Sequence, residues 1–81
     1  MLKIYGSMQC PDCQKCREDL DRAGIPYEYL DFSEGLAYLK AFLVLREQEP
    51  VFNAAREKGS IGIPCIVTED GTVSLTWEEF L

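Results

Sequence analysis

The apolar residues in the first third of the chain first alternate and then recur at helical spacing, which predicts a strand, a helix and a second strand. The segment from Leu2 to Tyr5 alternates and is rich in residues that favour strands. A helical pattern begins at Pro11 and ends at Gly24, because proline suits the first helical position and glycine the position after the last turn. Alternation returns from Pro26 to Phe32 and predicts the second strand. One apolar face of the predicted helix is formed by Cys13, Cys16 and Leu20.

The middle of the chain predicts two further helical segments. Ser33 suits the N-cap of a long helix with a broad apolar face. We expect this helix to break near Glu49, since the residue before a proline, here Pro50, is pushed out of helical geometry. A second helical piece from Val51 to Lys58 is predicted to end at Gly59.

The last third predicts a β-hairpin followed by a short helix. Cys65 to Thr68 and Thr72 to Leu75 resemble strands, and the Asp70-Gly71 pair between them is a strong turn signal. Thr76, with Glu79 three residues later, has the pattern of a capping box that opens a terminal helix.

The resulting order of elements, β-α-β-α-β-β-α, predicts the α/β class. Strand, helix and strand at the front imply a parallel pair with a right-handed crossover, while the hairpin adds an antiparallel pair. We therefore expect one domain over residues 1–81, with a four-stranded mixed central sheet flanked by helices.

Composition narrows the classes of function. The net charge of −6 argues against a nucleic-acid partner, because phosphates would repel it. The longest strongly apolar run, Ala41 to Leu45, is too short to cross a bilayer, and the N-terminal residues lack the pattern of a signal peptide. These features predict a cytoplasmic protein without a membrane partner, and structural disulfides are rare in that reducing compartment. The four cysteines therefore require a catalytic, metal-binding or packing explanation.

The spacing of Cys10 and Cys13 favours redox chemistry. The chain contains no histidine, so a thiol here cannot be activated by a neighbouring imidazole. Cys10 ends the loop before the first helix, where the unpaired helix amides favour a thiolate. Cys13, one turn further on, is placed to attack a mixed disulfide formed on Cys10. The charge of Asp12 opposes ionisation of Cys10, and we expect Lys15 to offset part of that charge.

Two motifs and the order of elements resemble the thioredoxin fold in its small, glutaredoxin-like form. The motifs are "CPDC" after the first strand and "GIPCIV" before the hairpin. The resemblance implies a cis bond between Ile63 and Pro64, with the Ile63 backbone docking the substrate beside the redox pair. It also implies that Pro64 and the residues between the cysteines, Pro11 and Asp12, contact the substrate.

The activity that the resemblance implies is thiol–disulfide oxidoreduction, with Cys10 and Cys13 as catalytic residues. The protein would reduce disulfides of proteins or of glutathione as a monomer without a bound cofactor. Glutathione, as a co-substrate, or a reductase protein would regenerate the dithiol. Three departures from the family pattern leave the use of glutathione open: Ser7 replaces a basic residue, Asp12 an aromatic residue, and Ser74-Leu75 a pair of glycines.

Other interpretations of the same residues stay open at this point. Cys16 and Cys65 are expected to pack as small buried hydrophobic residues. Alternatively, all four cysteines form a zinc or iron–sulfur site. A third interpretation is a redox-inactive binding module that presents a patch of residues near the C-terminus, namely Trp77, Phe80 and Leu81.

Overall fold

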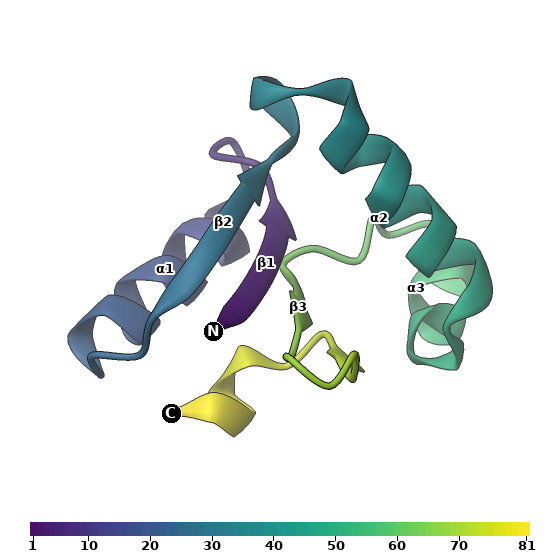
Figure 1. The fold of residues 1–81 in the computed structure, drawn as a ribbon. Coiled ribbons are helices and arrows are strands. Elements are labelled where there is room, and N and C mark those ends of the chain that lie inside the picture. The colour runs from purple at the N-terminus through teal and green to yellow at the C-terminus, as the bar shows by residue number, and fades with distance from the viewer.

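Four strands form one mixed sheet in the computed structural model, which describes residues 1–81 (Figure 1). The strands are β1 (Leu2–Gly6), β2 (Tyr27–Asp31), β3 (Cys65–Val67) and β4 (Val73–Ser74), and their order in the sheet is β2-β1-β3-β4. β1 pairs in parallel with β2 and antiparallel with β3, and β3 pairs antiparallel with β4. The expected parallel pair and hairpin are therefore confirmed, although both hairpin strands are shorter than predicted.

Three α-helices connect and cover the strands: α1 (Pro11–Arg22), α2 (Leu36–Gln48) and α3 (Asn53–Lys58). The predicted break is confirmed, because Glu49 has an extended backbone and a 3-10 turn over Pro50–Phe52 separates α2 from α3. Gly59 ends α3 in the left-handed region with φ of 72°, where glycine has no steric penalty. None of the helices is both long and apolar enough to cross a membrane.

Two predicted helix caps are wrong. Ser33 lies inside a 3-10 turn over Phe32–Glu34. Its backbone N–H and its hydroxyl both donate hydrogen bonds to the Asp31 carboxylate. The N-cap of α2 is instead Gly35, which makes no side-chain cap.

At the C-terminus, Thr76 occupies the N-cap position as predicted, but its side chain makes no capping hydrogen bond, and the predicted terminal α-helix is a 3-10 turn over Trp77–Phe80. In both places the side chain two residues before the expected cap accepts a hydrogen bond from the backbone N–H of the expected cap residue. Asp31 does so at the first site, and at the second the Ser74 hydroxyl accepts from the Thr76 N–H.

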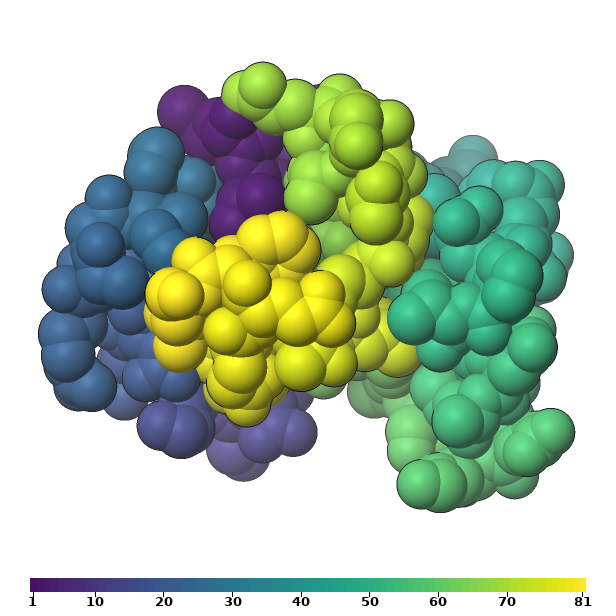
Figure 2. Space-filling view, turned by 90° about the horizontal axis from the view of Figure 1, so that it is seen from below, coloured from purple at the N-terminus to yellow at the C-terminus, as the bar shows by residue number.

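The core is divided between the two faces of the sheet, because successive strand residues point to opposite sides. Ile4 and Ile66 join one cluster with α1 and the C-terminal turn, whose buried members are Ile4, Cys16, Leu20, Ile66 and Trp77. Cys65, next to Ile66, packs on the other side with Phe42 of α2 and Phe52. Figure 2 shows these two layers on opposite flanks of the molecule, with the C-terminal turn beside the α1 layer. The expected burial of Cys16 and Cys65 is confirmed.

The C-terminal turn is attached to α1 by the indole of Trp77. Its Nε1–H donates to Asp19 Oδ2 at 2.9 Å, and the ring is buried in the α1 cluster. Phe80 also packs against this cluster, so of the three residues in the predicted docking patch only Leu81 is exposed. Of the patch that the binding-module interpretation requires, Trp77 is therefore part of the core and Phe80 is half-buried against it.

Candidate functional site

Cys10 occupies the N-cap of α1, immediately after the loop that follows β1. Its backbone is extended, with φ of −90° and ψ of 118°, and Pro11 is the first helical residue. Cys10 Sγ accepts a hydrogen bond from the Cys13 N–H at 3.3 Å. The expectation that this sulfur faces the free amides of the helix is thus confirmed. Cys10 is half-buried and is the one cysteine of the four that solvent reaches.

Cys13 lies in the first turn of α1, three residues after Cys10, and is completely buried. The pKa of the Cys13 thiol is raised to about 12, chiefly by burial and then by its hydrogen bond with Cys10, while the Ser7 backbone acts to lower it. Burial also raises the pKa of Cys16 to about 11 and that of Cys65 to about 12. At neutral pH these three residues are therefore protonated thiols.

Gly6, at the end of β1, allows the Cys13 sulfur and the Tyr29 hydroxyl to approach the backbone. A Cβ atom at position 6 would lie 2.9 Å from Cys13 Sγ and 2.7 Å from Tyr29 Oη. Real Cβ atoms do not approach neighbours this closely, so the two polar groups occupy the space of a missing side chain. Sulfur and hydroxyl therefore face the same point on β1.

Tyr29 is a member of this site that sequence analysis missed. Its buried hydroxyl has no hydrogen-bond partner, and the Arg17 guanidinium lies 4.4 Å from the centre of its ring. Burial, followed by the charge of the neighbouring Cys13, raises the pKa of Tyr29 above its ordinary value. Alternation predicted the strand that carries Tyr29, but only the parallel register, which pairs Tyr29 with Ile4, places it beside α1.

The other predicted site residues divide into two groups around the cysteine pair. Pro11 and Asp12 are exposed on the first turn of α1. The Ile63–Pro64 bond is cis, as the resemblance implied. Tyr5 pairs with Cys65, and continuing this antiparallel register brings Pro64 beside Gly6. Pro64 is buried and Ile63 half-buried, so the backbone before β3 approaches the end of β1 from which the cysteine loop begins.

Lys15, which we expected to offset part of the charge of Asp12, forms its ion pair with a different residue. Lys15 Nζ lies 3.5 Å from Asp19 Oδ1, one turn further along α1. Residues four apart on a helix are neighbours on its surface, so Lys15 and Asp19 lie within reach of each other. Asp12 thus makes no ion pair.

The four thiols do not converge on one point. Cys16 belongs to the cluster on the α1 face of the sheet, and Cys65 belongs to the cluster on the α2 face. No group of three cysteine or carboxylate side chains is positioned to share a metal ion. The arrangement therefore differs from the Cys₄ site that the metal-binding interpretation requires.

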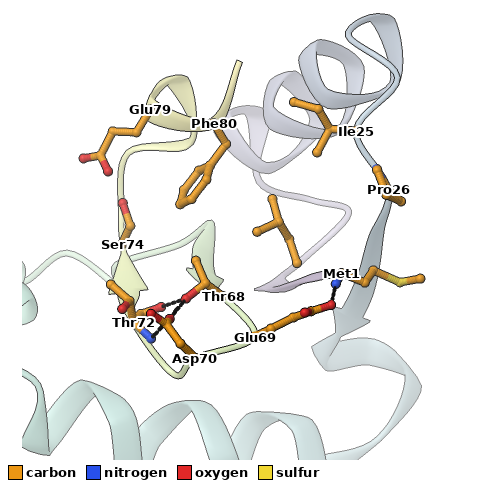
Figure 3. A pocket seen from close by; sticks show the side chains of 11 residues that line it. Met1, Ile25, Pro26, Thr68, Glu69, Asp70, Thr72, Ser74, Glu79 and Phe80 are labelled. Atoms are coloured by element: carbon orange, nitrogen blue, oxygen red, sulfur yellow. Dashed lines mark hydrogen bonds and ion pairs between the residues drawn. The ribbon is translucent and has the colours of Figure 1, made fainter.

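The largest hollow in the surface, about 640 Å³ in volume, lies at the other end of β1 from Cys10. Figure 3 shows its wall formed by Phe80 and Ile25 and its rim by polar side chains of the β3–β4 hairpin. Glu69 on this rim is paired with the N-terminal amine of Met1. No cysteine lines the hollow, so it is separate from the cysteine pair.

Comparison with known proteins relates the chain to one protein of undescribed activity. Over 72 residues the chain is 33% identical to an uncharacterized protein of Haemophilus influenzae, and the alignment covers 89% of this chain and 84% of that protein. No protein-family profile matches the sequence. No solved structure matches it either. The chain belongs to the same family as the H. influenzae protein.

Proposed function

We propose that this protein is a glutaredoxin-like thiol–disulfide oxidoreductase with a thioredoxin-like fold. The single observation that carries the proposal is the difference between the two cysteines of "CPDC". Cys10 is accessible and accepts a helix amide hydrogen, whereas Cys13 lies buried behind it. A thiol that reaches solvent at a helix N-terminus suits a nucleophile, and a buried thiol one turn away suits a resolving group. The sheet order and the position of Pro64 beside Gly6 agree with this fold.

The reaction proceeds in two exchange steps. The Cys10 thiolate attacks one sulfur of a substrate disulfide, a bond forms between the two sulfurs, and the other substrate sulfur leaves as a thiolate that takes up a proton. Cys13 then loses its proton and attacks Cys10 Sγ, which releases the second substrate thiol. The dithiol of the protein has supplied two electrons and has become a Cys10–Cys13 disulfide. Glutathione or a reductase protein is the proposed source of electrons for its reduction.

The surroundings of Cys13 support its role in the second step. A buried thiol is a weak nucleophile until it ionises, and burial holds the Cys13 thiol in its protonated form. The Ser7 backbone and the Tyr29 hydroxyl both act to lower the pKa of Cys13. The Tyr29 hydroxyl has no hydrogen-bond partner, so it is free to donate to a Cys13 thiolate. Tyr29 is thus proposed as a positioning residue.

The proposed substrate contacts follow the same arrangement. Pro11 and Asp12 are exposed beside Cys10, and the Ile63 backbone precedes the strand that pairs with β1. A disulfide held against Cys10 would therefore meet the first turn of α1 on one side and residues 63 and 64 on the other. The negative charge of Asp12 has no partner, which disfavours substrates with an acidic residue next to the disulfide.

Three cysteine variants test the proposal in an assay that follows the reduction of a mixed disulfide between glutathione and a peptide. Cys10→Ser should abolish reduction, whereas Cys13→Ser should form a mixed disulfide with the substrate that mass spectrometry detects as an added mass. Cys16→Ala is the matched control, because Cys16 lies on the same helix but in the core, and it should retain activity. Retained activity in Cys10→Ser, or loss of activity in a folded Cys16→Ala protein, would contradict the assignment.

A further inference from the structure

Helix α2 carries apolar side chains on two opposite faces, only one of which is used in the fold. Its inner face buries Phe42 completely, and Leu39 and Leu45 pack against the same cluster. On the outer face Leu36 is 74% exposed, Leu43 45% and Val44 52%. An amphipathic helix normally exposes its polar side, so three large apolar residues with this exposure show that the outer face of α2 lacks a partner within the chain.

The exposed residues form one continuous stripe. With 3.6 residues per turn, Leu36, Leu43 and Val44 lie within about 100° of each other around the helix axis, on the side away from Phe42. Two exposed charged residues of α2, Lys40 and Glu47, fall within the same arc. In Figure 2 the layer that contains α2 forms a separate flank of the molecule, on the side away from α1. We define these five residues as the outer stripe.

The charges of the outer stripe are complementary to those of a second copy of the same stripe. Lys40 and Glu47 make no ion pair within the chain, since the three pairs of the structure involve other residues. When two stripes are placed antiparallel about a two-fold axis between Leu43 and Val44, Lys40 of each copy faces Glu47 of the other. The same operation brings Leu43 of each copy against Val44 of the other. A two-fold interface requires such self-complementarity, with each contact made twice.

We infer that the outer stripe of α2 pairs antiparallel with the same stripe of a second copy, so that the protein forms a two-fold dimer. This inference replaces the monomer expected from the sequence. It does not depend on the proposed redox activity, because neither Cys10 nor Cys13 belongs to the stripe. One pair of helices buries less than the roughly 1,600 Å² of a standard stable complex, so we expect a dissociation constant in the micromolar range.

Sedimentation equilibrium over about a hundredfold range of protein concentration tests the inference. The wild-type protein should shift from the mass of one chain to that of two chains. Leu43→Glu should weaken dimerisation by roughly a hundredfold, because it places a charge at the centre of the interface. Leu81→Glu, which changes another exposed leucine outside the stripe, is the matched control and should dimerise as the wild type does.

A charge exchange distinguishes this arrangement from other dimers. Lys40→Glu and Glu47→Lys should each weaken the dimer by roughly tenfold, because each creates repulsion between like charges. The double variant Lys40→Glu/Glu47→Lys recreates both pairs with opposite polarity and should restore wild-type dimerisation. A wild-type protein that keeps the mass of one chain at every concentration would overturn the inference. A dimer unaffected by Leu43→Glu, or a double variant no better than the single ones, would also overturn it.

Discussion

A methyl group added at Gly6 provides the strongest test of the geometry around Cys13. In Gly6→Ala the new Cβ would lie 2.7 Å from Tyr29 Oη and 2.9 Å from Cys13 Sγ. Favourable contacts with a carbon atom lie near 3.5 to 4.0 Å, so both neighbours must move by roughly an ångström. Cys13 is completely buried and the Tyr29 hydroxyl is buried, so neither can rotate into solvent.

Overpacking of a well-packed core costs about 1–3 kcal/mol, and two simultaneous clashes place Gly6→Ala at about 2–3 kcal/mol. For a chain of this size, each kcal/mol lowers the midpoint of thermal unfolding by about 4–8 °C, so we expect a decrease of about 8–24 °C. The single tryptophan, Trp77, is buried and provides a fluorescence signal for thermal and urea unfolding. Gly35→Ala is the control, since its Cβ would meet no atom within 4 Å and its φ of 177° suits any residue.

A double-mutant cycle identifies the atoms responsible. Tyr29→Phe alone should leave stability unchanged or raise it, because the buried hydroxyl that it removes has no hydrogen-bond partner. In the Tyr29→Phe background the shortest contact disappears, and the remaining ones are 2.9 Å to Cys13 Sγ and 3.3 Å to the ring carbon Cζ. Gly6→Ala should therefore cost about 1 kcal/mol less in that background than in the wild type. Equal costs in both backgrounds, or a cost no larger than that of Gly35→Ala, would refute the described packing of Gly6, Cys13 and Tyr29.

Three further measurements follow from the same structure. Tyr29→Phe should slow the release of substrate from the Cys10 mixed disulfide by several-fold and leave the first attack by Cys10 unchanged, because the hydroxyl acts to lower the pKa of Cys13. Equal slowing of both steps in stopped-flow experiments would contradict this role. Stability against urea should fall as the pH rises from about 9 toward about 12, because thiols ionise there in the unfolded chain while the buried thiols of Cys13, Cys16 and Cys65 keep their protons, so that the unfolded state binds fewer protons. A urea midpoint that stays constant over this range would show that these thiols are not buried as described. Trp77→Phe should lower the thermal midpoint at neutral pH, and its difference from the wild type should shrink as the pH falls through the pKa of Asp19, which the Trp77 hydrogen bond holds below its ordinary value. A difference in midpoint that does not change with pH would argue against this hydrogen bond as the cause.

Most of the elements follow from local patterns in the sequence. Proline and glycine mark the ends of α1 and α3, and alternation marks β1 and β2, because these signals act through the backbone of the residues that carry them. The wrong predictions are also local, at Ser33 and Thr76. At both positions a cap pattern competes with a nearby polar side chain, and the pattern alone does not show which hydrogen bond forms.

The placement of Cys10 could be derived from the sequence, because its hydrogen bond to the Cys13 amide lies within one helical turn. Only the tertiary structure decided which groups surround the Cys13 sulfur. Gly6 and Tyr29 come from two strands, and they meet Cys13 of α1 because of the parallel register between β1 and β2. The tertiary structure likewise divided Cys16 and Cys65 between opposite faces of the sheet and left one apolar side of α2 uncovered. Such contacts join residues far apart in the chain, so they depend on how whole elements pack and not on the pattern within any one of them.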